Sequence, residues 1–131
     1  MKRIVTLLAA VVLAGCATVD PHLAEKQAAL HDNVPTCHEA KECEVKWAAA
    51  RSWVIDNAGM KIQNITDGYI ETYGPGDSMN LAVRVEKKPL PDGSYKIEAR
   101  VWCGNPFGCL RPPVDAALDF ERTVNNSYKP T

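Results

Sequence analysis

The residues with the widest chemical repertoire in this sequence are its cysteines, four of which form two pairs of identical spacing. Cys37 and Cys43 make one Cys-x5-Cys pair, and Cys103 and Cys109 make the other, inside the stretch WCGNPFGC. Such pairs are able to bind a metal, to exchange electrons as thiols, or to form disulfides. Structural zinc sites place their ligands about two to four residues apart, and thiol oxidoreductases use Cys-x-x-Cys, which the sequence lacks. We therefore expect disulfides, and neither a metal site nor a cofactor.

The amino terminus indicates the compartment in which these cysteines react. Residues 1–16, MKRIVTLLAAVVLAGC, start with a basic pair, continue with an apolar run from Ile4 to Leu13 and end in small residues. This is the order of a secretory signal peptide. The apolar run is shorter than the about 20 residues that span a bilayer, so a lasting transmembrane helix is not expected.

The signal ends in the tetrapeptide LAGC, which closes on Cys16 and resembles the lipobox of bacterial lipoproteins. The resemblance implies removal of residues 1–15 and attachment of lipid to Cys16. An ordinary signal peptide, cleaved nearby and leaving Cys16 as an incidental thiol, is the alternative. In Gram-negative lipoproteins an aspartate after the lipidated cysteine favours retention in the inner membrane, and Ala17 stands there instead. The implied address is the outer membrane, with the domain facing the periplasm.

Four cysteines remain once Cys16 is assigned to lipid, and an even number in an exported chain is typical of disulfides. Four cysteines allow three different pairings, and the sequence alone does not choose among them. The equal spacing favours two local bridges, Cys37 with Cys43 and Cys103 with Cys109. Each would contribute about 2 kcal/mol to stability through the entropy of the unfolded chain.

Length and charge favour one small domain with no affinity for nucleic acid. Cleavage before Cys16 leaves 131 − 15 = 116 residues, and the loss of Lys2 and Arg3 changes the formal net charge from −1 to −3. A net negative chain has no basic excess that would attract nucleic acid. Residues 16–36 are polar and alanine-rich, and we expect them to form a lipidated tether, with residues 37–131 as a single disulfide-stapled domain. Inside the tether, Asp20-Pro21 is a helix-start signal and Asp32-Asn33 with Pro35 is a stop, which allows a short helix near residues 21–31.

Hydrophobic periodicity predicts an α+β fold. Apolar stripes at helical spacing mark the first and last elements, and alternation with a period of two marks the elements between them. The expected elements are a helix over residues 39–58, strands over 60–65, 69–73, 79–88 and 94–102, and a helix over 113–126. We therefore expect a four-stranded antiparallel sheet with two helices on one face, in the order α-β-β-β-β-α.

The hairpin formed by residues 79–102 has the clearest alternation, and its faces suggest a register in which Lys88 lies opposite Ser94. That register pairs Val85 with Ile97, Val83 with Ala99 and Leu81 with Val101 on the apolar face, and Glu86 with Lys96 and Arg84 with Glu98 on the other. A slip by one residue would exchange the two faces, so we expect burial to set this register, and the opposite charges agree with it.

Four local features carry expectations of their own. A helix starting near Glu39 leaves Cys37 in the preceding loop, from which it folds back to its partner. Gly59 is suited to a left-handed helix cap, and Gly68, which ends an Asp-Gly dipeptide, to a type I′ hairpin turn. Glu121 falls inside the apolar arc of the last helix, where a basic partner or the sheet edge must accommodate it.

Catalysis is not expected. His22, His31 and His38 all precede the sheet, and solvated or helix-capping roles suit them better than acid–base chemistry. Ser78 follows Asp77 in a glycine-rich loop, without a nearby histidine or a nucleophile elbow. We therefore predict that the protein is not an enzyme, and a small hydrolase is kept as an alternative.

The best binding candidates lie in and beside the second cysteine pair. Arg100 and Trp102 alternate with the apolar positions of their strand and so face away from the core. Asn105 and Phe107 lie in a loop stiffened by glycine, proline and the expected disulfide. A stiff loop that presents an aromatic side chain binds protein partners at a low cost in ordering. The alternative is that Phe107 folds inward and Trp102 is covered by the tether or a helix end.

The sequence blocks KWAAARSWV, GMKIQ, ETYGP and WCGNPFGC resemble those of small uncharacterised envelope lipoproteins of proteobacteria. That resemblance implies an envelope location and no particular activity. We expect an outer-membrane-anchored periplasmic lipoprotein domain that binds or scaffolds an envelope protein without catalysis. An inhibitor or sensor module that acts on envelope hydrolases is the alternative.

The lipid anchor is tested by Cys16→Ser. If the thiol of Cys16 carries the lipid, the variant loses acyl labelling and is found as soluble or unprocessed protein after cell fractionation. Persistent membrane anchoring of the Cys16→Ser chain would contradict the lipobox assignment.

Overall fold

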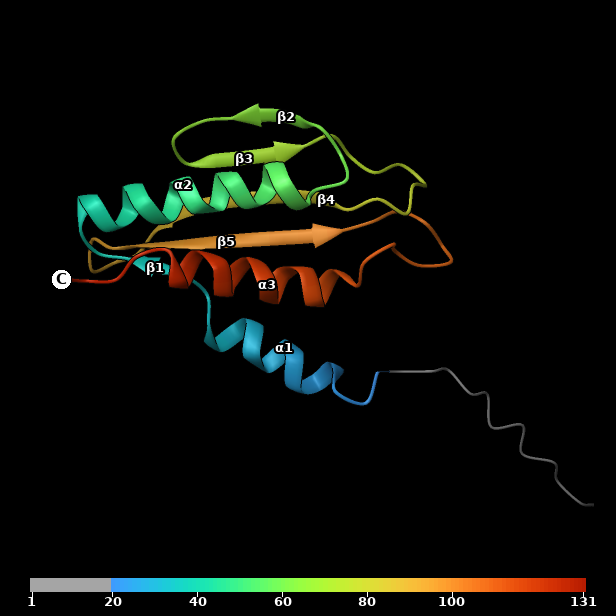
Figure 1. Ribbon diagram of the computed structural model, residues 1–131, viewed down its shortest axis with the longest axis horizontal. Coiled ribbons are helices and arrows are strands. Elements are labelled where there is room, and N and C mark those ends of the chain that lie inside the picture. Colours follow the sequence, from blue (N-terminus) through green and yellow to red (C-terminus); the bar gives the residue numbers. More distant parts are fainter. Residues whose placement is uncertain (1–19) are drawn as a thin grey trace, which may run out of the picture.

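The computed structural model describes residues 20–131 as one antiparallel sheet accompanied by three helices (Figure 1). The elements are α1 (Leu23–Asp32), β1 (Thr36–Cys37), α2 (Ala40–Asn57), β2 (Ile62–Ile65), β3 (Tyr69–Thr72), β4 (Ala82–Pro89), β5 (Tyr95–Trp102) and α3 (Pro113–Asn126). The strand order is β1-β5-β4-β3-β2. Among these residues no helix combines the length and the apolar character needed to cross a bilayer. Cys16 and the expected signal peptide lie outside the described residues.

The α+β class and the single antiparallel sheet are confirmed, but the expected four strands and two helices are wrong in number. The fifth strand, β1, has two residues, which is too short to produce an alternating pattern. The third helix, α1, matches the short helix that the start and stop signals allow near residues 21–31, but the expected order left it out because it buries none of its side chains and has no apolar stripe. It lies along α3 instead, where Lys26 Nζ is 2.9 Å from Asp115 Oδ1.

The core lies between one face of the sheet and the two helices α2 and α3, which run side by side across it (Figure 1). Between the two helices, Trp53 and Phe120 form an edge-to-face pair whose ring centroids are 5.3 Å apart. Trp53 also donates its indole N–H to Asp119 Oδ2 at 2.9 Å, and this bond is the main cause that lowers the pKa of Asp119. The core side chains are Ala50, Trp53, Val54, Ile70, Leu81, Val83, Val85, Ile97, Ala116, Phe120 and Val124.

The hairpin of β4 and β5 keeps its expected faces but pairs two residues away from the expected register. Lys88 lies opposite Lys96 rather than Ser94, and Val85 lies opposite Ala99. The loop explains the shift, because Leu90 N–H donates to Ser94 O at 2.8 Å, which closes a five-residue loop from 90 to 94. A shift of two residues preserves the parity of the strands, so burial does not distinguish the two registers.

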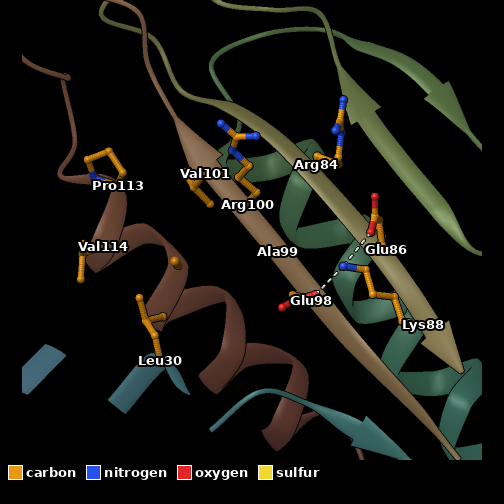
Figure 2. A pocket seen from close by; sticks show the side chains of 11 residues that line it. Leu30, Arg84, Glu86, Lys88, Glu98, Ala99, Arg100, Val101, Pro113 and Val114 are labelled. Atoms are coloured by element: carbon orange, nitrogen blue, oxygen red, sulfur yellow. Dashed lines mark hydrogen bonds and ion pairs between the residues drawn. The ribbon is translucent and has the colours of Figure 1, made fainter. Parts of the chain in front are cut away.

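The observed register creates a charge conflict that the predicted one lacks. Glu86 lies directly opposite Glu98, and like charges in that position destabilise a sheet. Lys88 relieves the conflict, because its Nζ lies 3.0 Å from Glu86 Oε2 and 2.7 Å from Glu98 Oε2 (Figure 2). Arg84, which was expected to face Glu98, instead forms an ion pair with Glu71 on β3.

Two of the predicted turn conformations are wrong. Thr66 N–H donates to Tyr69 O at 2.8 Å, which confirms a turn between β2 and β3. However, Gly68 does not have the positive φ that a type I′ turn requires. Gly59 is not a left-handed cap either, and it is needed for a different reason. A Cβ at that position would collide with the side chain of Asn80.

Glu121 is buried on α3, and no basic side chain within residues 20–131 forms an ion pair with it. Its Oε2 atom is buried without a hydrogen-bond partner in the described part of the chain. The partner expected for this carboxyl is therefore not found there. Burial disfavours the charged form and raises the pKa of Glu121 to about 7.

Glu121 makes the stability of the fold dependent on pH in a defined window. The pKa of Glu121 is about 7 in the folded chain, against an ordinary value of 4.5. Between these two pH values the native state therefore binds more protons than the unfolded state. The free energy of unfolding therefore falls as the pH rises through this window. Glu121→Gln should abolish that fall. The free energy of unfolding of the variant minus that of the native chain should therefore be about 1 to 3 kcal/mol larger at pH 8 than at pH 5. Urea denaturation at both pH values tests this, and parallel pH profiles for the two chains would refute it.

Candidate functional site

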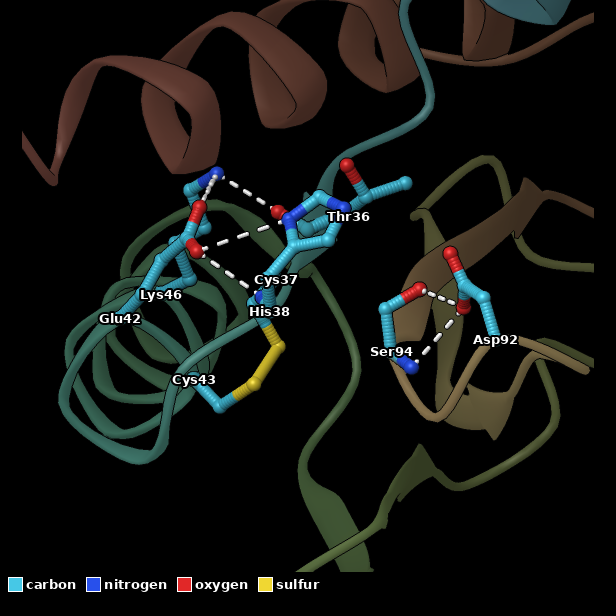
Figure 3. The surroundings of a disulfide bond; sticks show 8 residues. All are labelled: Thr36, Cys37, His38, Glu42, Cys43, Lys46, Asp92 and Ser94. Atoms are coloured by element: carbon cyan, nitrogen blue, oxygen red, sulfur yellow. Dashed lines mark hydrogen bonds and ion pairs between the residues drawn. A yellow bond between two sulfur atoms is a disulfide. The ribbon is translucent and has the colours of Figure 1, made fainter.

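The first disulfide, Cys37–Cys43, joins β1 to the first turns of α2 (Figure 3). Its Cα atoms are 5.0 Å apart, because Cys37 lies outside the helix and folds back onto it as expected. Beside it, Lys46 Nζ donates to Thr36 O at 2.6 Å and to Glu42 Oε1 at 2.8 Å. The bond from Lys46 is the main cause that lowers the pKa of Glu42. This bridge is structural: it fixes the short edge strand to the helix.

The second disulfide, Cys103–Cys109, closes the loop that follows β5, with its Cα atoms 5.8 Å apart. The confirmed disulfides are thus the two local pairs favoured by the equal spacing. Inside the loop, Phe107 N–H donates to Asn105 Oδ1 at 2.9 Å. The disulfide and this hydrogen bond both restrict the conformation of the loop that carries Phe107.

A second loop, residues 74–80, supports the disulfide loop from outside. Asn105 Nδ2 donates to Asp77 O at 2.9 Å, and Leu110 N–H donates to Met79 O at 3.0 Å. Gly104 lies so close to this second loop that a Cβ there would collide with the carbonyl of Gly76. Two segments far apart in the sequence therefore hold each other at one end of the sheet.

The two loops present three apolar side chains to solvent, which we call the apolar tip: Met79, Phe107 and Leu110. Phe107 is 93% exposed, Leu110 is 71% exposed and Met79 is 38% exposed. Exposed apolar side chains that belong to one rigid region are typical of protein-binding surfaces. Phe107 does not fold inward, and its loop holds it away from the core.

Arg100 and Trp102, the other two predicted binding residues, lie on β5 rather than in the loop. They alternate with Val101, which packs against the core. The guanidinium of Arg100 lies 5.1 Å from the centre of the Trp102 ring, a cation–π distance. Trp102 is half-buried and Arg100 is exposed. The predicted set therefore divides into a strand pair, Arg100 and Trp102, and a loop pair, Asn105 and Phe107.

Sequence reasoning missed two members of the apolar tip. Leu110 directly follows Cys109 and precedes Arg111-Pro112-Pro113, so a large apolar residue in a proline-rich loop was an available signal. Met79 had no such signal, because its position next to Leu110 depends on two loops meeting in space.

The arrangement offers a surface for binding more readily than groups for catalysis. His22, His31 and His38 have side chains that are 62 to 90% exposed, and each lies beside a carboxylate on its own segment. Within residues 20–131 no three His, Cys, Asp or Glu side chains lie close enough together to hold a metal ion. What the described chain does present is the apolar tip.

Comparison with known proteins adds no assignment: no family model, no curated protein and no solved structure matches this chain.

The close approach of the two loops can be tested with a matched pair of glycine variants. Gly104→Ala places a Cβ against the Gly76 carbonyl and should push the loops apart, lowering the free energy of unfolding by about 1 to 3 kcal/mol. Gly68→Ala is the control, because nothing lies within 4 Å of its added Cβ and its φ is negative. Urea denaturation gives the stabilities, and amide shifts of Ser78 and Met79 report the loop contact. Equal stabilities with unchanged shifts would show that the loops are not in tight contact.

Proposed function

We propose that this protein is a non-catalytic, outer-membrane-anchored periplasmic lipoprotein domain that binds or scaffolds an envelope protein through its apolar tip. The observation that carries the proposal is Phe107, an aromatic side chain that is 93% exposed on a loop closed by a disulfide. An exposed aromatic contributes nothing to the core. Burial against a partner would remove its apolar surface from water, which is favourable.

The stiffness of the loop favours binding over chance exposure. Association costs free energy when flexible segments become ordered, and a pre-organised loop avoids much of that cost. Phe107 is held by the Cys103–Cys109 bridge, by the bond from its own N–H to Asn105, and by the neighbouring loop through Asp77. Leu110, which follows Cys109 in the chain, is a second exposed apolar side chain of the apolar tip.

The proposed anchor keeps the domain near the membrane. Lipid on Cys16 would be separated from the start of α1 at Leu23 by seven residue steps, which reach about 25 Å at most when fully extended. Because α1 lies along α3, with Lys26 paired to Asp115, the anchor that holds α1 near the membrane also holds the rest of the domain there. The partner is then an envelope protein whose binding surface lies close to the same membrane.

The shape of the apolar tip favours one particular version of this role as a second candidate. A protruding rigid loop that carries a single large aromatic is suited to a concave surface, such as the cleft of an envelope hydrolase. An inhibitor or sensor module would use Phe107 in this way. The two candidates share the binding residue and differ in whether the partner's activity changes on binding.

The test is photo-crosslinking in intact envelopes, with the photoreactive side chain placed at Leu110, which is 71% exposed. The full chain should capture a defined partner. Phe107→Ser should reduce the affinity of the chain for that partner at least tenfold, because truncating an aromatic hot spot costs about 2 kcal/mol or more. Ile55→Ser is the matched control, since Ile55 is 59% exposed but lies on α2. An unchanged partner list for Phe107→Ser would remove the apolar tip as the binding site. Hydrolase assays with the captured partner distinguish inhibitor from scaffold.

A further inference from the structure

Strand β5 has an outer edge that the rest of the described chain covers only in part. On this edge, β1 pairs with Tyr95 and Lys96, and Ile97 N–H donates to Pro35 O at 2.7 Å. Beyond Ile97 no strand of residues 20–131 pairs with this side of β5. An uncovered strand edge presents unpaired N–H and C=O groups with which another strand can pair, and proteins usually protect such edges.

The direction of the hydrogen bond from Ile97 N–H shows which main-chain groups of β5 face this edge. Ile97 donates away from β4, and alternate residues of a strand point their N–H and C=O groups to the same side. Ala99 and Val101 therefore also direct their N–H and C=O groups outward. Within residues 20–131 neither residue has a hydrogen bond on that side. The edge thus offers two donors and two acceptors in the spacing of a strand.

A groove of about 510 Å³ runs along this edge (Figure 2). Leu30 of α1 and Val114 and Ala117 of α3 form its apolar wall. Glu98 and Arg100 of β5 line the opposite side. The groove continues over the outer face of the sheet, where Arg84, Glu86 and Lys88 of β4 also line it. An extended chain lying beside β5 would alternate its side chains between these two sides, because side chains of a strand alternate between faces.

The charges around the groove leave one cation without an anionic partner. Lys88 lies between Glu86 and Glu98, and Arg84 pairs with Glu71 on β3. Arg100 forms no ion pair within the described chain and only stacks on Trp102. An acidic side chain in the groove would complement Arg100.

We propose that this groove binds an extended peptide segment of another protein as an additional strand beside β5. The segment exchanges main-chain hydrogen bonds with Ala99 and Val101, directs apolar side chains toward Leu30 and Val114, and places an acidic side chain at Arg100. Main-chain pairing supplies affinity in such strand addition, and the alternate side chains supply specificity. This site is separate from the apolar tip and does not depend on it.

A second copy of the chain meets an obstacle in two of the registers in which it could pair with this edge. Two copies pair through a two-fold axis, so each residue meets its counterpart across the centre of the pairing. An axis at Ala99 would place Val101 of the second copy opposite Ile97, where Pro35 already lies. An axis at Arg100 would set the two Arg100 side chains against each other, which is destabilising. A lone peptide strand meets neither obstacle.

The test uses the full mature chain in detergent and three synthetic heptapeptides. The first alternates valine and threonine around a central aspartate, the second has lysine in place of that aspartate, and the third is the aspartate peptide with alternate amides methylated. The aspartate peptide should bind and slow hydrogen exchange at the amides of Ala99 and Val101 at least tenfold. The lysine peptide should bind about tenfold more weakly, and the methylated peptide should give no protection.

Two variants of the chain assign the contacts. Arg100→Glu should reverse the preference between the aspartate and lysine peptides, and its side chain is exposed, so the fold is retained. Phe107→Ser should bind the aspartate peptide like the native chain, which separates this groove from the apolar tip.

Three results would overturn the proposal. The first is the absence of protection at Ala99 and Val101 with the aspartate peptide. The second is equal protection by the methylated peptide, because strand pairing then plays no part. The third is protection in the free chain that grows with protein concentration together with a dimer mass in analytical ultracentrifugation, because the occupant is then a second copy.

Discussion

The structure depends on the burial of one face of β5 and β4 beneath two helices. Val83, Val85 and Ile97 are fully excluded from water against α2 and α3, and apolar burial is the main favourable contribution to folding. This burial fixes the parity of β5: Ala99 and Val101 turn toward the helices, and Glu98, Arg100 and Trp102 turn the other way.

Burial fixes parity, yet it leaves the register to weaker interactions. The predicted and observed pairings of β4 with β5 bury the same side chains, and only the loop from Leu90 to Ser94 distinguishes them. The favoured loop geometry places Glu86 opposite Glu98, and Lys88 compensates by contacting both. Surface ion pairs are worth about 1 kcal/mol or less. Loop closure therefore outweighs the cross-strand charge pattern, and the register inferred from burial is wrong because burial sets only the parity of the strands.

The same hierarchy explains which features the sequence was able to predict. The helices α2 and α3 and the strands of the sheet's centre follow from apolar periodicity, because burial imposes it. The disulfides follow from equal spacing and an exported chain, and the outward side of Arg100 follows from parity. The position of α1 follows from start and stop signals alone, because the helix buries no side chain. By contrast, β1 is too short for a pattern, and Met79 joins Leu110 only through loops that meet in space. Features that do not bury a regularly spaced set of apolar side chains leave no periodic trace in the sequence.

The open edge of β5 has an identifiable cause in the segment that leads from α1 to β1. To cover Ala99, β1 would have to continue backward through Val34 and Asn33 along β5. Asn33 instead accepts a hydrogen bond from Asn125 Nδ2 at 2.8 Å, which holds the chain against α3. Pro35 has no N–H to donate to a ladder and contributes only its carbonyl, to Ile97. The chain therefore runs beside β5 only from Pro35 onward. This course shortens β1 and leaves Leu30 lining the groove that a further strand would occupy.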